Sequence, residues 1–271
     1  MYCANKSRRG LTLKQTGSLI SDEHALRNKV PQVTLFFWLI KMMSTTVGET
    51  AADFLNFNLN WGLTNTTLAM SVLLLISLYV QMSAKKYVPA LYWLAVVLIS
   101  VVGTLISDNL ADNLGVPLEL STVLFALALL VTLVVWYRSE RTLSIHSITT
   151  RRREAFYWLT ILFTFALGTS AGDLVAESLG LGYLVSALIF AAVIGVIALA
   201  HYRFKLNAVT AFWLAYILTR PLGASLGDYL SQPRSEGGLE LGATGTSVIF
   251  VILICGLVVY LTKTKKDQLV L

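Results

Sequence analysis

Charged residues are scarce in this chain, and cysteines and histidines are rare. Only 13% of the 271 residues are charged, whereas a soluble domain carries about 25%. The two cysteines, Cys3 and Cys255, lie in a polar and an apolar segment far apart in sequence, so they predict neither a disulfide framework nor a thiolate metal site. The low charge content argues against a soluble globular protein.

Phosphate-binding and zinc-protease signatures are missing as well. The sequence has no phosphate-binding loop and no His-Glu-x-x-His zinc motif. The net charge of +6 comes from basic residues in short connections between apolar runs, where such residues orient membrane helices. We therefore expect a protein that is not an enzyme and does not bind nucleic acid.

Long apolar runs dominate the chain instead, and 56% of its residues are hydrophobic. Runs of about 17–23 residues can cross a bilayer as helices. They predict an all-α polytopic membrane protein with a polar cytoplasmic tail over residues 1–30, a membrane domain over 31–262 and a basic tail over 263–271. The eight predicted spans are roughly 33–55, 65–82, 89–111, 119–137, 155–176, 182–201, 207–230 and 245–262.

One pattern occurs four times in the predicted membrane domain. An aromatic residue precedes a Trp, a Gly follows ten residues after the Trp, and an Asp follows five residues after the Gly. The copies are Trp38, Gly48 and Asp53; Trp93, Gly103 and Asp108; Trp158, Gly168 and Asp173; and Trp213, Gly223 and Asp228. The pattern marks the first helix of four tandem helical hairpins at about 31–86, 87–142, 151–205 and 206–262. Membrane interfaces enrich Trp and helix contacts enrich Gly, so both are expected to serve repeat packing or anchoring.

Lysine and arginine placement predicts the orientation. Basic residues lie before the first span, between spans two and three, four and five, and six and seven, and after span eight. The opposite connections hold only Arg234, against Glu119, Glu236 and Glu240. The positive-inside rule then places both termini in the cytoplasm and gives all four hairpins the same orientation. The spacing is compatible with a ring of four hairpins and with a bundle of two plus two.

The acidic residues are the best candidates for function, because carboxylates within membrane segments are costly. Asp53, Asp108, Asp173 and Asp228 form the predicted substrate or ion-binding set. Glu49, Asp112 and Glu177 stand four residues from an Asp of that set, a spacing that puts both carboxylates on one helix face. Carboxylate oxygens suit hard cations, so a metal site could form from Glu49, Asp53, Asp108, Asp173 and Asp228.

Two basic residues lie inside predicted spans of the first and fourth copies. Lys41 follows Trp38 by three residues, and Arg220 follows Trp213 by seven. Buried charges need partners. We expect Lys41 and Arg220 to act as internal counter-charges to the carboxylates or to bind an anionic substrate.

The four tandem two-helix repeats, each with a Trp, resemble the bacterial membrane proteins built from the repeat of unknown function DUF347, over about residues 30–262. The resemblance implies a multi-pass protein of the bacterial cytoplasmic membrane and supplies no reaction.

Two functional hypotheses follow from the residues. The first is a transporter of a hard divalent metal or a proton-coupled cation that uses the repeated carboxylates, with either a bound divalent cation or no cofactor. The second is a membrane scaffold or sensor that does not transport, in which the Asp residues cap helices. The expected partners are the lipid bilayer and a small cation, and the oligomeric state stays open.

Overall fold

The computed structural model describes residues 28–58 and 61–268, and this part of the chain is built from helices without strands. The long α-helices are α2 Leu35–Asp53, α3 Leu63–Ser83, α4 Pro89–Asp108, α5 Leu118–Glu140, α6 Arg151–Asp173, α7 Tyr183–Phe204, α8 Ala208–Ser231 and α9 Ala243–Thr264. Each of them overlaps one predicted span, so the prediction of an all-helical fold is confirmed for the described residues.

Six of these helices are long and apolar enough to cross a membrane: α3, α4, α5, α6, α7 and α9. The other two are α2 and α8. Lys41, Glu49 and Asp53 lie on α2, while Arg220 and Asp228 lie on α8. The helices that fall short in apolar character are therefore the ones that carry the predicted counter-charges.

The first helices of the four repeats form a closed ring. Helix α2 packs against α4, α4 against α6, α6 against α8, and α8 against α2. We call α2, α4, α6 and α8 the axial helices. Of the two arrangements compatible with the sequence, the structure adopts the ring.

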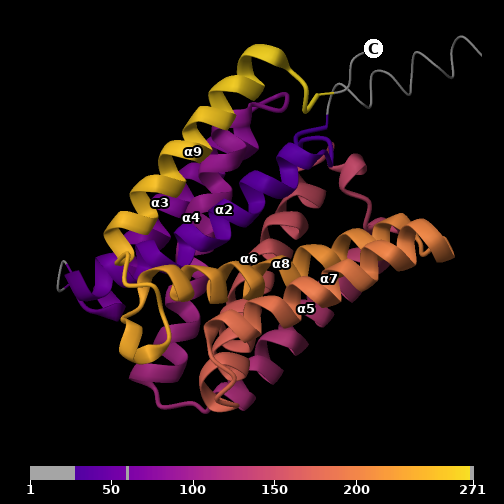
Figure 1. The fold of residues 1–271 in the computed structure, drawn as a ribbon. Coiled ribbons are helices and arrows are strands. Elements are labelled where there is room, and N and C mark those ends of the chain that lie inside the picture. Colours follow the sequence, from indigo (N-terminus) through magenta and orange to yellow (C-terminus); the bar gives the residue numbers. More distant parts are fainter. Residues whose placement is uncertain (1–27, 59–60, 269–271) are drawn as a thin grey trace, which may run out of the picture.

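The second helices, α3, α5, α7 and α9, lie outside this ring and are mostly exposed. Each outer helix packs mainly on the axial helix of the next repeat: α3 on α4, α5 on α6 and α7 on α8. Helix α9 closes the cycle on α2, and Figure 1 shows α9 lying along α2 and α7 lying along α8. The repeats are thus interlocked around the ring, whereas a simple hairpin would pair the two helices of one repeat.

The repeated glycines explain why the axial helices approach closely. A Cβ added at Gly48 would collide with Ser100, one at Gly168 with Arg220, and one at Gly223 with Thr45. In each case the side chain that needs the space stands seven residues after the Trp of the next repeat. Small residues commonly permit such contacts between membrane helices, and here one contact recurs at every junction of the ring.

The two ends of the ring differ in structure. At the acidic end, the axial helices of repeats one to three continue after their Asp into the π-helical turns η1 Phe54–Asn58, η2 Asn109–Asn113 and η4 Leu174–Ser178. In repeat four, α8 instead ends at Ser231 and is followed by the 3-10 turn η5 Arg234–Glu236. We call the opposite end, which holds residues 28 and 268, the tail end.

Both predicted tails contribute buried residues at the tail end, although residues 1–27 and 269–271 lie outside the described part. Lys29 is buried and forms a 2.8 Å ion pair with buried Glu154 at the start of α6. Asp267 is 1% exposed, and its carboxylate accepts a 2.6 Å hydrogen bond from the Tyr87 hydroxyl. The segments next to the termini therefore help to close this end of the ring.

Candidate functional site on the ring axis

Arg220 of α8 lies at the centre of the ring and is fully buried. Its Nη2 donates to Glu49 Oε2 of α2 at 2.8 Å and to Thr169 Oγ1 of α6 at 2.7 Å. The same nitrogen contacts Thr104 Oγ1 of α4, and Nη1 donates to the carbonyl oxygen of Thr45 at 3.1 Å. One guanidinium thus collects oxygen atoms from the other three axial helices, and we call these five residues the axial site.

The repeat register explains why these groups meet. Glu49, Thr104 and Thr169 each stand eleven residues after the Trp of their repeat, and Ala224 holds that position in repeat four. Because the four axial helices surround one axis, equivalent positions face each other across it. Ala224 leaves room there, and the guanidinium comes from Arg220, one helical turn earlier on α8.

Lys41 of α2 is the second cation near the axis, and it is 1% exposed. Its Nζ lies 4.1 Å from the centroid of the Phe165 ring and 4.5 Å from that of the Tyr216 ring. No hydrogen-bond partner for this ammonium occurs within residues 28–58 and 61–268. Arg220 and Lys41 both contact Phe165, since the Arg220 Cζ lies 5.5 Å from the same centroid.

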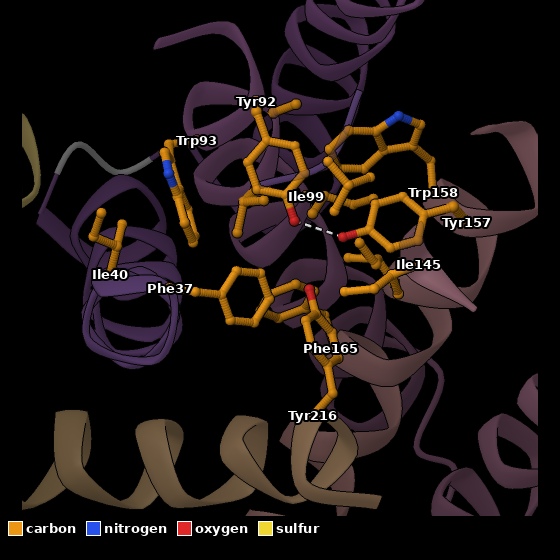
Figure 2. Packing of buried hydrophobic residues seen from close by; sticks show 14 of the residues in the cluster. Phe37, Ile40, Tyr92, Trp93, Ile99, Ile145, Tyr157, Trp158, Phe165 and Tyr216 are labelled. Carbon is orange, nitrogen blue, oxygen red and sulfur yellow. Dashed lines mark hydrogen bonds between the residues drawn. The ribbon is translucent and has the colours of Figure 1, made fainter. Parts of the chain in front are cut away.

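An aromatic layer covers the axis between Lys41 and the tail end. Figure 2 shows the hydroxyl groups of Tyr92 and Tyr157 pointing toward each other, and these atoms are 2.5 Å apart. Phe37 and Tyr216 face the same space from α2 and α8. All four side chains are at most 1% exposed, so this layer is a packed core that contains hydroxyl groups.

The four repeated Asp residues lie at the acidic end of the ring. Asp228 is buried, and Asp53, Asp108 and Asp173 are partly buried. The four helices that carry them pack side by side around the ring, which places the four carboxylates at one end of it. Asp53 Oδ2 also accepts a 3.4 Å hydrogen bond from Gln232. The ring therefore brings the repeated carboxylates within electrostatic reach of the axial site.

The auxiliary carboxylates divide into two kinds. Glu49 is 6% exposed and belongs to the axial site, whereas Asp112 and Glu177 are exposed in the π-helical turns η2 and η4. Glu177 accepts a 3.2 Å hydrogen bond from Tyr183. Within the described residues, no group of three His, Cys, Asp or Glu side chains is placed to hold one metal ion.

The repeated Trp residues lie in helix contacts near the tail end. Trp93, Trp158 and Trp213 are buried, while Trp38 is partly buried. Trp213 Nε1 donates a 2.9 Å hydrogen bond to the carbonyl oxygen of Leu143, in the loop between α5 and α6. That loop includes η3 Ile145–Ser147, and the side chain of Ile145 packs in the same apolar core.

Several axial groups were absent from the sequence prediction. Thr104 and Thr169 were not selected, although aligning the four copies places both opposite Glu49. The hydroxyl groups of Tyr92 and Tyr157 were also missed, since the residue before each Trp was treated only as an aromatic. Register across the repeats was the signal that could have found all four.

The repetition of sequence and structure agrees with a known family. Residues 36–87, 91–142, 156–207 and 211–267 each match the family described as Repeat of Unknown Function (DUF347). The chain belongs to this family. Its four DUF347 repeats cover most of the described residues, and the predicted family relationship is confirmed. No curated protein and no solved structure matches the chain, so the chemistry of the DUF347 ring has to be inferred from its own side chains.

Proposed function

We propose that this DUF347 protein is a membrane transporter that carries a small cation through the ring of axial helices in exchange for protons. The binding site in this proposal is formed by four residues of the axial site, Glu49, Thr45, Thr104 and Thr169. Arg220, the fifth, fills it in the present conformation. The carboxylates of Asp53, Asp108, Asp173 and Asp228 form the approach from the acidic end. All eight long helices cross the bacterial cytoplasmic membrane, with both termini in the cytoplasm.

The observation that supports this proposal most strongly is the set of atoms around the Arg220 guanidinium. A carboxylate, two hydroxyl groups and a backbone carbonyl contact one positive charge in a fully buried place. Oxygen atoms of these kinds bind hard cations. Arg220 acts as a tethered substitute for the transported ion, and its movement away from the axis would leave an oxygen-lined site for that ion.

The arrangement favours an exchanged cation over a tightly held divalent metal. Among the described residues, Glu49 is the one carboxylate that bonds to the guanidinium. A site with a single carboxylate and neutral oxygens releases its ion more easily than a chelating cluster does. A transported ion has to leave as well as bind. A small cation coupled to protons fits this requirement better than a resident metal.

The proposed membrane orientation is supported by exposed charge at the two ends. Lys85, Lys86, Arg141 and Lys205 are exposed in tail-end connections. At the acidic end, Arg234 is paired with Glu240 at 3.7 Å. Lysine and arginine remain preferentially in the cytoplasm.

Cysteine labelling tests this orientation with a matched pair of exposed serines, in a background without Cys3 and Cys255. Ser83→Cys lies at the tail end and Ser178→Cys at the acidic end. An impermeant maleimide should label the first only from the cytoplasmic side and the second only from outside. The reverse pattern would refute the orientation.

Ion flux in liposomes tests the function. Purified protein is assayed with Na⁺, K⁺, Mg²⁺ and Mn²⁺ in turn, with and without a pH gradient. Asp228→Asn and Glu49→Gln should each reduce flux per folded protein by about a hundredfold or more, because both remove a charge that a cation requires. The matched control is Glu119→Gln, which changes an exposed carboxylate at the acidic end. Folded variants with wild-type flux would exclude these carboxylates from transport.

The alternative is a membrane scaffold or sensor that does not transport. The tight glycine contacts at the ring junctions support the scaffold or sensor, because close helix packing is found in a rigid core as well as in a carrier. A folded wild-type protein with no flux for any cation tested would support this alternative.

A further inference from the structure

Lys41 is the axial group that the proposed binding site leaves without a role. Its ammonium lies between the rings of Phe165 and Tyr216, and nothing in the described part of the chain accepts a hydrogen bond from it. Aromatic faces attract a cation, but they do not replace the acceptors that water supplies. Burial of this kind makes the charged amine expensive to keep.

The charges around Lys41 add to this cost. Arg220 from α8 contacts the same Phe165 ring, and Glu49 on α2 is already bonded to Arg220. Tyr92 of α4 and Tyr157 of α6 face the region with neutral hydroxyls. The other helix packed on α2 is α9, where the Tyr260 ring contacts Phe36 in a tilted arrangement and Lys263 is exposed. The Glu49 carboxylate is therefore bonded to Arg220 and not to Lys41, and like charges repel strongly where the dielectric constant is low.

Hydroxyl groups lie between Lys41 and the tail end of the ring. The Tyr216 ring contacts the Lys41 ammonium, and Figure 2 shows the Tyr216 hydroxyl directed toward the pair formed by Tyr92 and Tyr157. The Tyr216 hydroxyl is buried and makes no hydrogen bond to any described residue. A hydroxyl can accept one proton and donate another, so a Tyr216 hydroxyl bonded to this pair would pass a proton along the axis.

We propose that Lys41 is the proton-exchanging residue of the transporter and that Tyr216, Tyr157 and Tyr92 connect it to the cytoplasmic side. This inference rests on the proposed function and identifies its coupling step. When a cation enters the axial site, an N–H bond of the Lys41 ammonium breaks and the proton moves to the Tyr216 oxygen. Each hydroxyl accepts one proton and passes on its own, so one proton leaves the axis for each cation that enters. The reverse transfer restores the ammonium and expels the cation.

Proton movement and ion flux are measured together in the same proteoliposomes, with a pH-sensitive dye inside and Na⁺, K⁺, Mg²⁺ or Mn²⁺ as the probe ion. Lys41→Met removes the amine at similar length, and Lys41→Arg keeps a cation that does not release its proton. Tyr216→Phe keeps the ring and removes the hydroxyl. Lys86→Met changes an exposed basic residue at the same end and is the control.

Each Lys41 variant should lose proton movement by about a hundredfold, a typical contribution of a positioned proton-transfer group, and Tyr216→Phe should slow it by a smaller factor. Exchange of labelled cation across equal concentrations should be lost in Lys41→Arg as well, because its permanent charge opposes the entering cation. The inference is wrong if Lys41→Arg moves protons at the wild-type rate. It is also wrong if wild-type flux ignores the pH gradient, a result that leaves cation transport in place and removes its coupling to protons. If the wild-type protein moves none of the four ions, the proposed function fails and the inference fails with it. Should Lys41→Met not fold, Tyr216→Phe and Lys41→Arg decide the question.

Discussion

The axial helices of repeats one and four differ from those of repeats two and three. At the positions that face the axis, α2 and α8 supply Lys41, Glu49 and Arg220, whereas α4 and α6 supply hydroxyl and aromatic groups such as Thr104 and Phe165. The first and fourth helices are neighbours only because the ring closes. The repeated sequence thus gives four equivalent axial helices, and ring closure brings α2 and α8 together.

The largest effect is expected from removing Glu49, which leaves the Arg220 charge without its partner. Glu49→Gln should destabilise the protein by about 3–5 kcal/mol, because it leaves the Arg220 guanidinium buried without a carboxylate. Thr104→Val removes a neutral contact to the same guanidinium and should cost only about 1–2 kcal/mol. Thermal unfolding in detergent measures both. The double variant Glu49→Gln with Arg220→Met should regain most of the loss, and equal losses for the two single variants would contradict the comparison.

A second contrast sets the junctions of the ring against its outside. Gly168→Ala places a Cβ against Arg220 and Pro221 and should destabilise by about 1–3 kcal/mol through overpacking. Gly195→Ala is the matched change on the outer helix α7, where a Cβ would meet nothing within 4 Å. That variant should be more stable than wild type by about 0.5–1 kcal/mol, since Ala favours a helix over Gly. The same unfolding assay decides, and a stabilised Gly168→Ala would refute the close approach of α6 and α8.

The hydroxyl groups of repeats two and three should act together on the Arg220 guanidinium. Thr104 and Thr169 both contact Arg220 Nη2, so the effects of Thr104→Val and Thr169→Val should not add. The expected interaction energy in a double-mutant cycle is about 0.5 kcal/mol or more. Thr262→Val, at an exposed site on α9, should add independently to either change. Additive losses for Thr104 and Thr169 would mean that the two hydroxyls do not share one partner.

The smallest expected effect on stability is at the tail end, away from Arg220 and Glu49. Burial raises the pKa of the Asp267 carboxyl above its usual range, although the hydrogen bond from Tyr87 opposes this shift. The folded state therefore keeps the Asp267 proton to higher pH than the unfolded state does. The stabilisation is complete below the unfolded pKa of about 4 and is lost as pH rises through the higher folded value. Asp267→Asn should flatten this part of the stability curve in thermal unfolding scans, and an unchanged slope would exclude Asp267 as its source.

The helices were predictable from the sequence, but the partners of each helix were not. Apolar runs predicted the eight helices. Lys41 and Arg220 marked α2 and α8 as the helices with a basic residue inside a predicted span. The bond between Arg220 and Glu49 depends on α8 lying next to α2, which ring closure decides and no local pattern encodes. The burial of Trp213 likewise depends on the loop carbonyl of Leu143. Membrane interfaces and packed cores both enrich Trp, so composition alone could not choose between them.

The closure of α9 onto α2 has a consequence for synthesis of the chain. Among the described helices, α2 emerges first from the ribosome, but two of its neighbours, α8 and α9, emerge last. Until then Glu49 has no Arg220 to bond, and α2 is one of the two helices that fall short of the apolar character of a membrane span. A nascent chain that stops after α7 would expose this polar helix to lipid without its partners. Assembly of the ring is therefore completed only after α8 and α9 have emerged, and a truncation before α8 damages the first repeat as severely as the last.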